Sequence, residues 1–242
     1  MRGAHRHVKV TDMATAAFDY LPHTHIAPAT AALAREVGEH YLEANSMPSA
    51  APVVAAYRQL QAETDRLLRQ VLKRTSPAAV RVVFTWCREP YVSDRELIDS
   101  VRATRVLEVT TAAIESEPLH PVLDCGYGEA FDRFRALHDL IGHVRTGLGF
   151  GLADELAVWR SQDRMHGALA RRALATELLA VNGARSVLGR APELKAMLLD
   201  PTLVCRARAS IPLRDDAPSS LAGIGFTTSR KVMSGRRSIR NL

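Results

Sequence analysis

Apolar residues recur at three- and four-residue spacing along most of this 242-residue chain. Such spacing places them on one side of a helix. The pattern predicts helices over residues 28–44 and 53–73 in the first part of the chain. Two further helices are predicted over 130–144 and 152–188, with Gly167 as a point where the second can break.

Two short stretches depart from the helical pattern. Residues 81–86 are β-branched and aromatic, and residues 106–110 alternate between apolar and polar side chains, so both are expected to be strands. Between them, Ser93 followed by Glu96 is typical of a helix N-cap. The sequence therefore predicts a mainly α fold class, a helical single domain with a small antiparallel β element around residues 80–110.

The composition agrees with one soluble, cytoplasmic domain. Hydrophobic residues make up 47% of the chain, which is room for one sizeable core. No apolar run approaches the roughly 18 residues that a membrane-spanning helix requires, and the first residues lack the apolar stretch of a secretory signal. The three cysteines are odd in number and widely spaced, which argues against a disulfide framework and favours a reducing compartment.

The positive charge is concentrated at one end of the chain. The net charge is +6, and residues 206–242 carry eight basic and two acidic side chains, which account for the whole excess. Everything after Asp200-Pro201 lacks a regular pattern. We therefore expect an N-terminal extension over 1–27, a helical metal-binding domain over 28–205 and an irregular basic C-terminal tail over 206–242. Only this tail offers a surface for nucleic acid or another acidic partner.

Three potential metal ligands share a spacing in the second half of the chain. Glu155, His166 and Glu177 are spaced eleven residues apart. On one continuous helix, eleven residues are about three full turns, so each of these side chains would point within about 20° of the one before it. The same side is otherwise apolar, and an unpaired carboxylate there is costly. A metal ion would compensate it, as would a core arginine such as Arg133 or Arg135, or backbone donors.

A pair of histidines lies just before this helix. His138 and His143 flank Asp139 and Gly142 in the segment H-D-L-I-G-H. On an ideal α-helix, positions five apart point about 140° away from each other. The two imidazoles can share a metal only at a helix end or at a local widening such as a π-bulge, and Gly142 permits that distortion.

The segment H-D-L-I-G-H-V resembles the H-E-L-L-G-H-V-P signature of biopterin-dependent aromatic amino acid hydroxylases. The resemblance implies that His138 and His143 bind ferrous iron, that a pterin serves as cosubstrate, and that a later glutamate completes a two-His-one-carboxylate site. Glu177 follows His143 by 34 residues and corresponds best to that glutamate. Asp139 stands where the family has Glu, and Arg145 stands where it has Pro.

A longer run, between Phe134 and Asn182, resembles an uncharacterised domain of phage and bacterial proteins with the pattern FRAVHDxxGH…GFG…TTETRGQN. The agreement includes both motif histidines, Glu155 and Glu177. A histidine common in that pattern is Gln162 here. The resemblance implies no particular activity.

These features favour a mononuclear non-heme Fe(II) oxygenase or hydroxylase that acts on a small, amino-acid-like molecule with O₂. Asp139 and Glu155 are the candidate catalytic residues, which would orient the imidazole ligands or the substrate. The expected metal ligands are His138, His143 and Glu177, with Glu155 and His166 as alternatives.

Three other functions remain open from the sequence. A carboxylate-bridged di-metal oxidase would use the spaced acids together with the histidine pair. A metal-dependent phosphohydrolase of the HD type would pair His138-Asp139 with His120 and with Asp163 or Asp200. A helical adaptor with a basic tail would need no redox-active metal.

Overall fold

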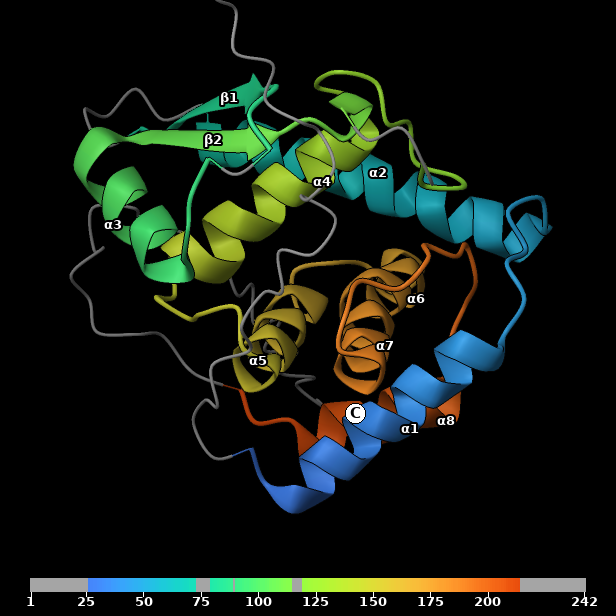
Figure 1. Cartoon of the computed structure of the whole chain (residues 1–242). Helices are drawn as coiled ribbons and strands as arrows, with labels where there is room; N and C mark the ends of the chain where they lie inside the picture. Colours follow the sequence, from blue (N-terminus) through green and yellow to red (C-terminus); the bar gives the residue numbers. More distant parts are fainter. Residues whose placement is uncertain (1–25, 73–78, 89, 115–118, 214–242) are drawn as a thin grey trace, which may run out of the picture.

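The computed structural model describes residues 26–72, 79–88, 90–114 and 119–213. The expected N-terminal extension up to residue 25 and the basic tail from residue 214 lie outside these ranges. The predicted fold class is confirmed, because helices dominate and the sheet has two strands (Figure 1). In the described part of the chain, no helix is long and apolar enough to cross a membrane.

Helices surround the centre of the molecule, where α5 and α7 lie side by side, with α4 on one side and α1 on the other (Figure 1). The elements, in chain order, are α1 (Pro28–Glu43), α2 (Ala51–Leu72), β1 (Arg81–Thr85), α3 (Asp94–Thr104), β2 (Val106–Thr110), the short 3₁₀ turn η1 (Ala112–Ile114), α4 (Ala130–His138), the π-helix η2 (Asp139–Val144), α5 (Leu152–Asp163), α6 (Ala170–Leu174), the π-helix η3 (Ala175–Ala180), α7 (Val181–Leu188) and α8 (Pro201–Ser210).

The two strands pair in parallel, so the expected antiparallel arrangement is wrong. Arg81 pairs with Val106 and Thr85 with Thr110. The connection explains this direction. Helix α3 follows β1 and precedes β2 in the chain, and this helical crossover returns the chain to the end of the sheet at which β1 began. The predicted cap is confirmed, because the Ser93 side chain accepts a hydrogen bond from the backbone N–H of Glu96.

Two large apolar clusters form most of the core in the described residues, and Leu148, Ala157 and Val158 form a third, small one. The largest joins α1, α2, α5, α6, η3, α7 and α8, and the second packs the β-α-β unit and α2 against α4 and η2. Helices α1 and α7 approach most closely at Gly38 and Gly183, where a Cβ on Gly38 would overlap the backbone of Gly183. This close contact holds α7 directly against α1, and α7 also packs against α5.

The predicted long helix over 152–188 is divided. Helix α5 ends at Asp163, and the chain turns before α6 begins at Ala170, with the Gly167 N–H donating to Glu63 on α2 at 2.7 Å. The eleven-residue spacing therefore does not correspond to one helix face. Glu155, His166 and Glu177 lie on α5, in the turn and on η3, so the continuous stripe is a wrong prediction.

The region after Asp200 is also more regular than expected. The Asp200 side chain accepts from the Thr202 N–H at 2.6 Å and Pro201 occupies the first turn, which together start α8. Helix α8 buries Val204 and Ala207, and its Arg208 donates to both oxygens of Asp163 at 3.0 and 2.7 Å. The expected boundary at residue 206 thus falls inside a packed helix.

Candidate metal centre

The histidine pair lies where α4 changes into a π-helix. Hydrogen bonds in a π-helix run over five residues, as in the bond from the Arg145 N–H to the Leu140 carbonyl at 3.0 Å. Positions five apart are then one turn apart and on the same side. His138 and His143 accordingly face each other, with their Nε2 atoms 3.0 Å apart. The expectation that a π-distortion brings the two imidazoles together is confirmed.

Glu155 completes the group from the first turn of α5. One carboxylate oxygen lies 3.5 Å from His138 Nε2 and the other lies 3.6 Å from His143 Nε2. Helix α5 can approach η2 this closely because residue 142 is glycine: a Cβ there would lie 2.6 Å from a methyl group of Val158. The missing side chain of Gly142 thus allows the close contact between η2 and α5.

The spacing of these donor atoms fits one metal ion. Ligand atoms at about 2.1 Å from a metal, at angles of 90° to 109°, lie about 3.0–3.4 Å from one another. The two Nε2 atoms are 3.0 Å apart and lie 3.5 and 3.6 Å from different oxygens of Glu155, and with one donor atom taken from each residue the three atoms lie within 4.8 Å of one another. Within the described ranges, His138, His143 and Glu155 are the one group of three or more His, Cys, Asp or Glu side chains close enough to hold an ion.

The outer nitrogens of both imidazoles have partners. His143 Nδ1 lies 3.0 Å from the Leu148 carbonyl, which can only accept, so Nδ1 carries the proton and Nε2 has a free lone pair. The amide of Gln162 on α5 lies 3.1 Å from His138 Nδ1. In a metal-bound state this nitrogen must donate, so the Gln162 side chain would present its oxygen to it.

Burial and charge act on the protonation of the three groups. Burial by itself raises the pKa of the Glu155 carboxyl, but the neighbouring imidazoles of His143 and His138 outweigh it and lower that pKa. Burial likewise lowers the pKa of His138, yet its hydrogen bond with Glu155 and the charge of that group raise it overall. The lowered pKa of Glu155 favours its charged form, which binds a cation, whereas the raised pKa of His138 favours an imidazolium whose proton a bound metal ion would displace.

Asp139, an expected catalytic residue, lies beside the group. It is half-buried in the first turn of η2, and its carboxyl is in electrostatic contact with His138 and His143. Burial raises the pKa of Asp139, and the two histidines oppose that rise. Its carboxyl is not one of the donors that could hold the ion.

Glu177, the glutamate expected as third ligand, is placed elsewhere. The hydroxyl of Tyr57 on α2 donates to its carboxylate, and His120 Nε2 lies 3.1 Å from the same oxygen. His120 Nδ1 accepts from the backbone N–H groups of Val122 and Leu123, so its proton is on Nε2 and is donated to Glu177. Two side-chain donors thus satisfy this buried carboxylate without a metal, and Glu155 takes the place that we predicted for Glu177.

The remaining candidate ligands are also separated from the centre. His166 Nδ1 donates to the Gln162 carbonyl at 2.9 Å, and burial lowers the pKa of this histidine. Asp163 pairs with Arg208, and Asp200 caps α8. The residues that a di-metal site or an HD-type site would need are therefore not gathered around His138 in the described structure.

Several contacts of the centre had little signal in the sequence. Asn182 on α7 donates to a Glu155 oxygen at 3.3 Å, and Phe150 places its ring edge-on to His143 with centroids 4.8 Å apart. Both residues belong to the longer resemblance, which could have indicated them. In the sequence, Tyr57 is an ordinary inward-facing residue of its helix, so its hydrogen bond to Glu177 could not be predicted.

No family model, curated protein or solved structure matches the chain.

Proposed function

We propose that this chain is a mononuclear non-heme iron enzyme, an oxygenase or hydroxylase that acts on a small molecule with O₂. The observation that carries the proposal is the donor set, two imidazole Nε2 atoms 3.0 Å apart and one carboxylate whose two oxygens lie 3.5 and 3.6 Å from them. This ligand set is typical of non-heme Fe(II) oxygenases. A ferrous ion bound there would supply open coordination positions for O₂ and for the substrate.

The protein side chains would hold the centre in a fixed geometry. The Leu148 carbonyl sets the tautomer of His143, and Gln162 contacts the outer nitrogen of His138. Asn182 holds one oxygen of Glu155. Such outer partners orient metal ligands and raise metal affinity. The ring of Phe150 packs edge-on against the imidazole of His143.

Asp139 is the proposed catalytic residue beside the ligands. Its carboxyl is close enough to both imidazoles to interact with them electrostatically and does not belong to the donor set, so we assign it to the substrate and not to the metal. The amino-acid-like substrate and the pterin cosubstrate rest on the resemblance of the H-D-L-I-G-H-V segment alone. The free state of the cysteines supports a cytoplasmic location.

Anaerobic purification followed by Fe(II) titration and metal analysis tests this proposal. We expect one tightly bound iron per chain, and an electron paramagnetic resonance signal typical of a high-spin iron–nitrosyl complex when nitric oxide is added. His143→Ala should abolish both, whereas His166→Ala, which removes a buried histidine outside the centre, should retain both. Two metals per chain would favour the di-metal oxidase, and a zinc-specific site that does not bind nitric oxide would favour a hydrolase.

A further inference from the structure

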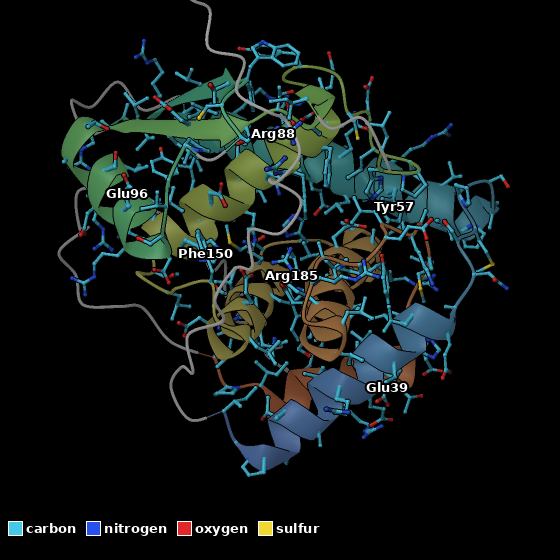
Figure 2. All side chains as sticks on the ribbon, viewed as in Figure 1. Glu39, Tyr57, Arg88, Glu96, Phe150 and Arg185 are labelled. Carbon is cyan, nitrogen blue, oxygen red and sulfur yellow. The ribbon has the colours of Figure 1, made fainter. Side chains whose placement is uncertain are left out.

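Helix α7 turns one side toward the metal centre. Asn182 shows which side this is, because its Nδ2 lies 3.3 Å from a Glu155 oxygen. Arg185 follows three residues later, one helical turn on and within about 60° of the same direction. Figure 2 shows Arg185 between α5 and α7, below α4. Arg185 is half-buried, and its side chain lies at the border of the same site.

The charge of Arg185 acts on the centre directly. It is among the charges that influence the pKa values of both His138 and Glu155, and it lowers both. Among the described residues, its guanidinium forms no ion pair and no hydrogen bond. By contrast, Arg160 on α5 pairs with Asp163, and Arg133 on α4 pairs with Asp65.

A free cation next to a metal site is electrostatically unfavourable unless an anion lies between the two. Two neutral imidazoles and one carboxylate leave a bound divalent ion with one excess positive charge. Arg185 adds a second. A guanidinium is planar and binds a carboxylate through two parallel hydrogen bonds, whereas a phosphate dianion usually requires several cationic groups.

We propose that Arg185 binds the carboxylate of a small organic acid, which places the rest of that molecule against the open side of the His138–His143–Glu155 centre. The position next to the metal rests on the proposed function. The anion site itself does not rest on it, because Arg185 lacks an anionic partner within the described structure whether or not a metal is bound. Asn182 would be a positioning residue, which holds Glu155 one helical turn from the bound carboxylate.

Fluorine NMR with 3,3,3-trifluoropropionate as the probe and 3,3,3-trifluoropropionamide as its neutral counterpart tests the proposal. We expect the acid to bind more tightly than the amide to both metal-free and Co(II)-loaded protein. Arg185→Gln should weaken binding of the acid by about 10- to 100-fold and leave the amide unchanged, since a charge-assisted bidentate pair is lost. Arg185→Lys should restore part of that affinity. Arg190→Gln, an equal charge change at an exposed position just after α7, should bind as the wild type does.

Paramagnetic relaxation of the fluorine signal in the Co(II)-loaded protein reports on the metal separately. Strong relaxation that disappears in Arg185→Gln would support both the anion site and its place beside the metal. Failure of the protein to bind Co(II) would contradict the proposed function. In that case, the preference of the metal-free protein for the acid over the amide would still show whether Arg185 binds a carboxylate. Equal binding of the acid to wild type and Arg185→Gln would overturn the proposal.

Discussion

The Nε2 atoms of His138 and His143 lie 3.0 Å apart, although an α-helix would point these two residues away from each other. The π-helix η2 makes this contact possible, and Gly142 in the same turn lets α5 bring Glu155 against both imidazoles. Local backbone geometry and close packing are therefore the two requirements of the candidate centre. Each can be tested separately.

Gly142→Ala should disturb the contact between η2 and α5. The added methyl group would lie 2.6 Å from Val158 Cγ1, so one of the two elements must move. We expect a loss of about 1–3 kcal/mol in the free energy of unfolding, as for other overpacked cores, together with weaker metal binding. Urea denaturation and metal titration measure the two effects. Adding Val158→Ala removes the overlapping methyl group and should restore metal binding in part; no restoration would mean that Gly142 acts only through the π-turn.

Gln162 should tune the centre without being part of the donor set. Gln162→Leu leaves His138 Nδ1 without its partner, so metal affinity should fall by about 10- to 100-fold while a saturated preparation still binds one ion. Gln162→His, which introduces the residue common in the resembling phage and bacterial pattern, should retain more affinity. Competition with a chelator provides the measurement. Wild-type affinity in Gln162→Leu would show that the amide contact does not orient His138.

The buried Tyr57–Glu177 pair should contribute to stability and not to metal binding. Tyr57→Phe removes a donor to a buried carboxylate, and a loss of about 1–3 kcal/mol in the free energy of unfolding is expected. Tyr41→Phe is the matched control, because the Tyr41 hydroxyl donates to a neutral carbonyl, that of Glu193 at 2.9 Å. Its effect should be smaller. If the folded Tyr57→Phe variant failed to bind metal, the Tyr57–Glu177 pair could not be independent of the metal centre.

Alkaline pH should destabilise the fold through the same tyrosine. Burial, and after it the negative charge of Glu177, raise the pKa of Tyr57 well above its ordinary value near 10. The folded chain then retains a proton that the unfolded chain loses, so the stabilisation is complete below about pH 10 and declines as pH rises further. Unfolding free energy measured against pH should fall less steeply in Tyr57→Phe than in the wild type. Identical slopes would contradict a buried, protonated Tyr57.

Arg208 should matter more than its neighbour Arg206, although both lie on α8. Arg208 pairs with Asp163, which is buried, whereas the Arg206–Glu36 pair is exposed. Arg208→Ala leaves a buried carboxylate with fewer partners, and we expect a loss of about 1–3 kcal/mol in the free energy of unfolding. Arg206→Ala should change stability little. Thermal unfolding of both variants makes the comparison, and equal effects would show that Asp163 does not depend on Arg208.

The sequence predicted most elements because their signals are local. Helical spacing indicated α1, α2 and the α4–η2 segment, and β-branched residues indicated both strands. Strand direction could not be predicted in the same way, since it depends on the path of α3 across the pair. Helix α8 was missed because its start signal, Asp200-Pro201, was interpreted as the end of regular structure.

The candidate site was predictable in part for a similar reason. Two histidines five residues apart can share a metal only at a helix end or where the helix widens into a π-turn, so the sequence itself indicated both the His138–His143 pair and the local structure that it needs. The choice between Glu155 and Glu177 depends on where the chain turns between α5 and α6, and on Tyr57 and His120 from distant parts of the sequence. Periodicity carries no information on such contacts, so the assumption of a single continuous helix favoured Glu177, which the structure places outside the histidine cluster.

Metal content of Glu155→Gln and Glu177→Gln, each purified without air and titrated with Fe(II), tests the central claim most directly. Glutamine keeps the shape of both side chains, and at position 177 it can still accept from Tyr57 and His120. We predict that Glu155→Gln loses tight iron binding while Glu177→Gln retains one iron per chain. Iron retained in Glu155→Gln and lost in folded Glu177→Gln would contradict the account.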